Sequence, residues 1–292
     1  RIMTGAPIPA GADTVVRFED TQLRADTVEI LRAPRGGANV RQAGEDVRVG
    51  QVVVDAGVVL RPQEIGMLAA VGCVEASVVR RPRVAILATG DEVVAPEQTP
   101  GPGQIRDANS YTIAAQVRAY GGIPLLLGVA RDQEDLVRDG MRKALEQAAD
   151  LIITSGGVSV GDFDLVKQVL AAEGTMHFWS LNMKPGRPLA FGVVDGPSTG
   201  SGRSVPLMGL PGNPVAAMLS TELFGRPVIM KMQGFTNWPR PMVQARLGHP
   251  IPRQDDRRRF VRVRLHETDT GYTAIRTGDQ GSGILNSMVQ AD

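Results

Sequence analysis

From Arg83 onward, short apolar runs rich in β-branched residues alternate with segments that have the spacing of amphipathic helices. The runs at 84–88 and 150–154 predict buried strands, the run at 123–129 predicts a further strand, and 109–120 and 132–149 predict helices, the first capped by Asn109. Such alternation is typical of an α/β fold, a three-layer sandwich with a mostly parallel sheet. These sheets bind ligands beyond the carboxyl ends of their strands. Candidate functional groups are therefore sought after each strand.

The loop after the strand at 150–154 is the most informative one. It begins with Ser155-Gly156-Gly157 and reaches Asp164, and helical spacing follows at 165–170. Glycines let backbone N–H groups approach an anion closely, and the helix start adds the positive end of its dipole. Asp162 and Asp164 would repel a phosphate unless a divalent cation lies between them. One of them is equally explained as a helix N-cap, and the two roles can coexist.

Acidic residues recur after other predicted strands. Asp91 and Glu92 follow the first strand, and Asp132 follows the second. No periodicity requires carboxylates at these places, so their recurrence indicates a site at this edge of the sheet. For Asp132, a capping-box-like arrangement with Asp135 is the alternative explanation.

Two cations flank a Pro-Gly turn later in the chain. Lys184 and Arg187 precede a predicted strand at 189–194, so both can project from one short loop. Near a glycine loop, such a pair suits phosphate, although each residue alone would be an ordinary surface charge. A further strand at 205–210 leads into Pro211-Gly212-Asn213-Pro214 and a helix at 215–224, which Gly225-Arg226-Pro227 should break or kink.

The segments on either side of this pattern are β-rich. We expect a β-rich segment at 1–43 with strands at 14–18 and 28–31, a connecting domain at 44–80 with a helix from Pro62, and a central α/β domain at 81–232. A small β domain at 233–292 should contain strands at 242–247, 259–265 and 272–276. Both ends of the chain lie in mid-pattern, so we expect it to be part of a longer protein.

Composition limits the partners of this chain. Its 32 Lys and Arg against 31 Asp and Glu give a net charge of +1, which argues against nucleic-acid or membrane-surface binding. The basic run at 257–259 and Arg262 is explained by an amphipathic strand with a solvated basic face, and the three dispersed histidines disfavour a zinc site. The single cysteine, Cys73, has an apolar context and is predicted to fill a core in a reducing compartment. With no apolar run of membrane length, a cytoplasmic protein is expected.

Several motifs, taken together and in this order, resemble the molybdopterin molybdenumtransferase family, the MoeA type to which the gephyrin E domain also belongs. They are Met3-Thr4-Gly5-Ala6-Pro7, Arg41 with Gly44-Glu45-Asp46, Ala88-Thr89-Gly90-Asp91-Glu92, Gly156-Gly157-Val158-Ser159-Val160-Gly161-Asp162, Met183-Lys184-Pro185-Gly186-Arg187-Pro188 and Leu210-Pro211-Gly212-Asn213-Pro214. The resemblance implies a molybdopterin-binding-like central domain. It also implies that adenylylated molybdopterin and molybdate react to give molybdenum cofactor and AMP, with Mg²⁺ as the divalent cation.

The resemblance carries roles over to individual residues. It implies Glu92, Asp132, Asp164 and Lys184 as catalytic residues, with Glu92 and Asp164 as metal ligands. Substrate-binding roles are implied for Gly156, Gly157, Ser159, Arg187, Pro211, Pro214 and Ser282. Family members often carry a basic residue where this chain has Ser180, so that contact is missing or is supplied by Arg187.

The resemblance also implies a homodimer with composite sites. Thr4, Arg41 and Asp46 match positions that complete the site of the neighbouring subunit. A molybdopterin adenylyltransferase and recipient molybdoenzymes are possible further partners. Two other functions are compatible with the pattern: the adenylyltransferase step itself, whose enzymes resemble residues 81–232, and a gephyrin-like scaffold that binds partner proteins. The flanking β parts and the Leu-Pro-Gly-Asn-Pro stretch favour metal insertion.

Overall fold

The computed structural model describes residues 1–157, 174–195, 204–238, 240–251 and 255–292. The chain divides into two compact units, Arg1–Ala76 and Ser77–Asp292, and each is considered by itself. Among the described residues, none of the helices combines the length and the apolar character that crossing a bilayer requires. The predicted domain boundaries at 43, 80 and 232 stay predictions.

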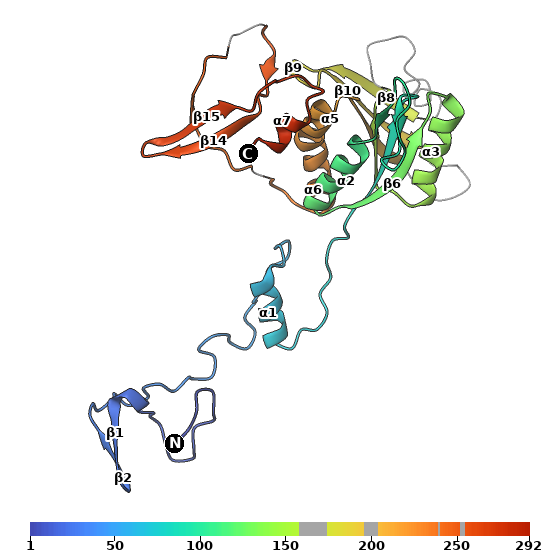
Figure 1. Cartoon of the computed structure of the whole chain (residues 1–292). Coiled ribbons are helices and arrows are strands. Elements are labelled where there is room, and N and C mark those ends of the chain that lie inside the picture. Colours follow the sequence, from blue (N-terminus) through green and yellow to red (C-terminus); the bar gives the residue numbers. More distant parts are fainter. Residues whose placement is uncertain (158–173, 196–203, 239, 252–254) are drawn as a thin grey trace. The chain divides into compact units, whose positions relative to one another are not determined.

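The second unit is built on one six-stranded sheet (Figure 1). Its strands are, in order across the sheet, β6 (Ile123–Ala130), β3 (Arg83–Thr89), β7 (Leu151–Ser155), β11 (Ser204–Leu210), β10 (Pro188–Asp195) and β8 (Gly174–Ser180). The first four run parallel, whereas β10 is antiparallel to both β11 and β8. The mostly parallel sheet and the predicted central strands are confirmed, and β8 is an addition to them.

Helices cover both faces of this sheet because alternate strand residues point to opposite sides. Val84 and Ile86 pack in one apolar cluster with residues of α2 (Asn109–Ala119) and α6 (Arg226–Met232). Ala85 and Leu87 belong to a second cluster with residues of α3 (Glu134–Glu146). In Figure 1, α2, α5 (Pro214–Ser220) and α6 lie on one side of the sheet and α3 on the other. The predicted three-layer α/β sandwich is confirmed.

The helix starts differ from the sequence-based expectation. Asp107, not Asn109, satisfies the start of α2, because its Oδ1 accepts a hydrogen bond of 3.0 Å from the backbone N–H of Ser110. Asn109 is the first helical residue, and its side chain makes no cap. Helix α3 begins at Glu134 with Gln133 as N-cap, so Asp132 does not cap it either. The carboxylate of Asp132 thus has no structural role in starting the helix.

The helical segment after β11 changes its winding ahead of the predicted break at 225–227, and the chain stays helical through Arg226 and Pro227. Helix α5 passes into a π-helical turn, η2 (Thr221–Gly225), before α6 continues the chain. A π-turn has i→i+5 hydrogen bonds and so takes in one more residue than an α-helical turn. Helices often kink at such turns. Glu222 in this turn pairs with Arg240, at 3.1 Å between carboxylate oxygen and guanidinium nitrogen. The pair ties the segment after α6 to the helical layer.

A smaller sheet of β12 (Ala245–Leu247), β15 (Gly271–Arg276) and β14 (Val263–Thr268) follows, with the short helix α7 (Asn286–Val289) after it. The strand predicted at 259–265 is split, because β13 (Arg258–Arg259) leaves this sheet and pairs with β9 (Met183–Lys184). The expected solvated basic face is wrong for Arg262, which is 7% exposed. Its Nε donates to Ser287 Oγ at 3.0 Å and its Nη2 to the Gly281 carbonyl at 2.9 Å, and burial lowers its pKa.

The first unit contains the hairpin β1 (Thr21–Arg24) and β2 (Thr27–Ile30), the one-turn helix η1 (Phe18–Asp20) and α1 (Pro62–Ala70). The prediction of a strand at 14–18 is wrong. The Val15 N–H instead donates a hydrogen bond of 3.0 Å to the carbonyl of Ala38, which lies in a turn. None of residues 1–76 is buried. Cys73 is exposed beyond the end of α1, so its predicted place in a core is wrong.

Candidate functional site

The strand directions bring the predicted groups to one edge of the sheet. Since β3, β6, β7, β11 and β8 run in the same direction, their last residues lie at the same edge, called here the carboxyl edge. Those last residues are Thr89, Ala130, Ser155, Leu210 and Ser180. Neighbouring strands are about 4.8 Å apart, so the edge from β6 to β8 extends over roughly 24 Å.

Carboxylates gather at the β3–β6 end of this edge, the acidic end. The backbone N–H of Asp132 donates to Asp91 Oδ1 at 3.2 Å, which joins the loops after the two strands. The Glu92 side chain folds back on Gly90, where an added Cβ would lie 2.6 Å from Glu92 Oε2. Burial raises the pKa of Asp132, and the negative charges of Asp91 and Glu92 add to that rise against an opposing backbone hydrogen bond with Asp91. The acidic end therefore concentrates negative charge.

The acidic end supplies part of a ligand set for a cation. Within the described ranges, no three His, Cys, Asp or Glu residues are arranged to hold a metal ion. Asp164, a predicted ligand, lies outside the described residues, as do Ser159 and Asp162. Carboxylate oxygens are nevertheless the ligands that Mg²⁺ prefers in proteins, and Glu92 and Asp132 come from adjacent strand ends. The described carboxylates are thus of the ligand type that a divalent cation takes, but by themselves they do not form a complete ligand set.

A glycine junction occupies the centre of the edge. Gly156 has φ of +94°, and a Cβ there would lie 2.5 Å from the Thr89 carbonyl oxygen, so only glycine fits. Its N–H donates to the Leu210 carbonyl at 3.0 Å, and the substrate-binding role of Gly156 stays a prediction. The N–H group is already used in the sheet. Gly157 follows with φ of +64°, and the loop beyond it lies outside the described residues.

The loop after β11 packs against this junction. A Cβ at Gly212 would lie 3.7 Å from the Gly156 Cα. Pro211 is buried, and Pro214 occupies the first position of α5, as the sequence predicts. Asn109 joins the two loops, a role that the sequence conceals because its place resembles a helix cap.

The cationic end lies over β8 and β10. The Leu181 N–H donates to the Arg187 carbonyl at 2.7 Å and closes the loop that carries Lys184. Arg187 Nε donates to Ser180 Oγ at 2.7 Å, so a guanidinium lies beside the position that is often basic in the resembling family. Strand β13 pairs with β9 in this loop, and Phe260, directly after β13, donates its N–H to the Lys184 carbonyl at 2.9 Å. Both predicted cations therefore leave one constrained loop.

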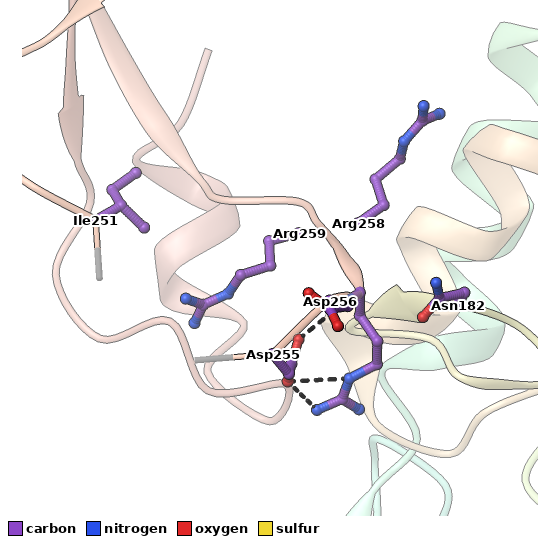
Figure 2. A pocket seen from close by; sticks show the side chains of 7 residues that line it. Asn182, Ile251, Asp255, Asp256, Arg258 and Arg259 are labelled. Carbon is purple, nitrogen blue, oxygen red and sulfur yellow. Dashed lines mark hydrogen bonds and ion pairs between the residues drawn. The ribbon is translucent and has the colours of Figure 1, made fainter. Parts of the chain in front are cut away.

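An open pocket of about 530 Å³ borders the cationic end (Figure 2). It is lined by Asn182, Ile251 and residues 255–259. The Arg257 guanidinium, with Nε 3.0 Å from Asp255 Oδ2, holds the pKa of Asp255 below its usual range, and the charge of Lys184 adds to this effect. Because guanidinium and carboxylate groups both line it, the pocket is not a simple anion site.

The C-terminal domain also reaches the carboxyl edge. The Val215 N–H in the first turn of α5 donates to the Ser282 carbonyl at 3.1 Å, which brings this predicted residue beside the Pro211–Pro214 loop. Arg262 supports the same segment through its bond to Gly281. Because Arg262 follows a basic run, the sequence gives no signal that this arginine is buried and supports the segment at 281–282. Thr4, Arg41 and Asp46 are exposed in the first unit, and their assignment to a neighbouring subunit's site stays a prediction.

Family models match three consecutive parts of the chain. The MoeA N-terminal region (domain I and II) matches residues 1–72, the probable molybdopterin binding domain matches 85–231, and the MoeA C-terminal region (domain IV) matches 244–292. These matches follow the chain in the order that the sequence motifs predict.

Individual relatives agree with the family models. A molybdopterin molybdenumtransferase of Nostoc sp. is 38% identical over the whole chain, which covers 66% of that protein. One of Haemophilus influenzae is 35% identical, and the chain covers 71% of it. The MoeA crystal structure from Pyrococcus horikoshii matches 98% of this chain with a TM-score of 0.74 and 30% identity, and 67% of that chain is covered. The chain thus spans about two thirds of its relatives' length and belongs to the molybdopterin molybdenumtransferase (MoeA) family, which acts in molybdenum cofactor biosynthesis.

Proposed function

We propose that the protein inserts molybdate into adenylylated molybdopterin and releases AMP. The observation that carries this proposal is the division of one edge into an acidic end and a cationic end, with glycine and proline loops between them. An edge of roughly 24 Å suits an elongated substrate that carries several anionic groups. A compact substrate would not engage both ends.

Mg²⁺ is proposed to bind at the acidic end through Glu92, and the family resemblance implies Asp164, outside the described residues, as a second ligand. When bound, the cation would neutralise charge on the phosphoanhydride that is cleaved. The chain's own part is to hold the loops after β3 and β6 together, which the hydrogen bond from the Asp132 N–H to the Asp91 carboxylate supports. The raised pKa of Asp132 fits a site that a cation would stabilise.

The cationic end is proposed to hold anionic parts of the substrates. Lys184 acts as an exposed point charge, and Arg187 presents a planar fork next to the Ser180 hydroxyl. Arg187 would thus supply the cation that a basic residue at position 180 supplies elsewhere in the family. Molybdate and tungstate are nearly equal in size and charge, so the charges of Lys184 and Arg187 give no basis for a preference between them.

A homodimer with composite sites is proposed for the same protein. The first unit has no buried residue, and the β1–β2 hairpin exposes Leu23, Val28 and Ile30 by more than half. Two-stranded hairpins are marginal by themselves, so these apolar side chains need a further surface. A second copy that receives Thr4, Arg41 and Asp46 at its carboxyl edge would meet that need.

The cytoplasm is the proposed compartment, where a molybdopterin adenylyltransferase would supply the substrate and molybdoenzymes would receive the product. The single exposed cysteine, Cys73, has no second cysteine in the chain to pair with, which suits a reducing environment.

The reaction is tested with the protein, adenylylated molybdopterin, molybdate and magnesium chloride. AMP release that requires molybdate, together with activation of an added apo-molybdoenzyme, is the expected result. Incubation with molybdopterin and ATP separates the neighbouring reaction, since adenylylated molybdopterin formed there would assign the chain to the adenylyltransferase step. Absence of both products would favour a scaffold.

Composite sites are tested by mixing two inactive variants, Arg41→Ala and Asp164→Ala. Subunit exchange should produce heterodimers with one intact site, and about a quarter of wild-type activity should return if exchange is statistical and the sites are independent. A mixture that forms heterodimers yet stays inactive would place both residues in one chain's site.

A further inference from the structure

Asn109 lies where the two central loops of the carboxyl edge meet. Its Nδ2 donates two hydrogen bonds, both of 2.7 Å, one to Ser155 Oγ and one to the Gly212 carbonyl. Ser155 is the last residue of β7 and is 3% exposed, and it directly precedes the Gly156–Gly157 turn. Gly212 belongs to the Pro211–Pro214 loop after β11. One carboxamide therefore bridges the ends of two adjacent strands.

The backbone around this bridge is tightly constrained. Gly156 is fixed on one side by its N–H bond to Leu210 and on the other by the Thr89 carbonyl, against which no Cβ would fit. Beyond Leu210, the Gly212 carbonyl accepts its hydrogen bond from Asn109, which links the loop back to β7. Pro211 and Pro214 have no backbone N–H to donate, so fewer backbone hydrogen bonds are available to hold this loop, and the side-chain bond from Asn109 adds to them.

We propose that Asn109 is a positioning residue of the substrate site, which sets the distance between the Gly156–Gly157 turn and the Pro211–Pro214 loop. The inference rests on the proposed function, because it assigns the two loops to one substrate. Asn109 acts through these loops and does not itself react. Displacing a substrate-binding loop by about 1 Å can lower a rate roughly a hundredfold, far more than one neutral hydrogen bond contributes to stability.

Gln116 offers a matched control on the same helix. Its Nε2 also donates to one hydroxyl and one backbone carbonyl, Tyr120 Oη and the Met218 carbonyl, each at 3.0 Å. Asn109 Oδ1 and Gln116 Oε1 are both buried without a hydrogen-bond partner among the described residues. The two carboxamides are therefore alike in chemistry and burial, but Gln116 joins α2 to α5 and touches neither loop.

The experiment compares wild type, Asn109→Ala, Asn109→Asp and Gln116→Ala in the full protein. Aspartate keeps the size of asparagine but cannot donate to the Gly212 carbonyl when ionised. Both substitutions at 109 should raise the KM for adenylylated molybdopterin by about tenfold to a hundredfold. Gln116→Ala should lower Tm by a similar amount to Asn109→Ala and leave KM within about twofold of wild type.

A crystal structure of Asn109→Ala completes the test without depending on activity. The expected result is a wider separation of Gly156 and Gly212 than in wild type. An unchanged loop would overturn the inference whatever the kinetics, and so would equal KM values for Asn109→Ala and Gln116→Ala in an active wild-type background. If wild type itself lacks activity, the proposed function fails, while the loop separation still decides the role of Asn109.

Discussion

The two ends of the carboxyl edge treat charge in opposite ways. At the acidic end, Asp91, Glu92 and Asp132 crowd together, and the pKa of Asp132 rises because burial and like charges disfavour its ionised form. At the cationic end, Lys184 and Arg187 leave one loop, and nearby Asp255 offsets part of their charge and has a lowered pKa. Like charges repel one another at the acidic end, whereas Asp255 already neutralises part of the positive charge at the cationic end.

This difference indicates which partner each end responds to. Crowded carboxylates gain most from a small divalent cation, which several oxygens can share. Exposed cations next to a carboxylate interact with anions through screened electrostatics, which depend on ionic strength. Magnesium and salt should therefore act on different ends, and variants at each end should respond to one and not to the other.

Glu92→Gln should have the largest effect. Replacing a carboxylate that holds a cation by a neutral amide should lower kcat by about a hundredfold or more, because the charge stabilised in the transition state is lost. Steady-state rates over a magnesium titration measure this, and Glu97→Gln, at an exposed position in the turn after β4 (Val93–Val94), is the matched control. Wild-type rates for Glu92→Gln at saturating magnesium would remove Glu92 from the acidic end.

Lys184→Ala should have the next largest effect, mainly on binding. Loss of one exposed point charge should raise the KM of the anionic substrate about tenfold at low ionic strength. The difference from wild type should shrink as salt rises towards 1 M, since screening removes what the charge supplied. Lys143→Ala, which removes an exposed lysine from α3, controls for net charge. A KM that is unchanged at low salt would exclude Lys184 from the site.

The sequence predicts the sheet well and the contacts along its edge poorly. Apolar runs specify β3 and β7 because these strands are buried almost throughout, which leaves few alternatives, whereas β6 at the edge of the sheet is only partly buried. The edge depends on tertiary contacts instead. Asn109 in a cap-like position and Arg262 in a basic strand both have local explanations, yet their side chains bond to residues far away in the chain. Local periodicity contains no information about such partners.

The first unit shows the same limit in another form. Its valine-rich stretches alternate as strands do, but the strand at 14–18 is absent and no residue of the unit is buried. A hydrophobic pattern specifies which face should be buried, not which surface will cover it. In β3 the covering helices come from the same chain, whereas residues 1–76 find no such cover within their own unit.

Asp132→Asn should raise stability while lowering activity. A carboxyl group with a raised folded-state pKa favours folding most below its unfolded pKa, and this contribution is lost as pH rises through the folded value. At neutral pH the ionised group therefore costs stability, and the neutral amide removes that cost. Thermal unfolding at pH 7.5 should show a small increase in Tm, which disappears at acidic pH where Asp132 is protonated. A lower Tm at pH 7.5 would contradict the picture of crowded charge.

Asp255→Asn should have the smallest effect and the opposite sign. Removing this carboxylate takes a negative charge away from Lys184 and leaves Arg257 without its ion-pair partner at 2.5 Å, so the cationic end gains attraction for anions. Both partners are partly exposed, which limits the gain to about a twofold lower KM at low salt, and none is expected at high salt. Asp269→Asn, in the exposed turn between β14 and β15, removes the same charge from the same domain and should change nothing. A higher KM for Asp255→Asn would mean that this carboxylate holds the pocket in shape and does not merely tune the charge beside Lys184.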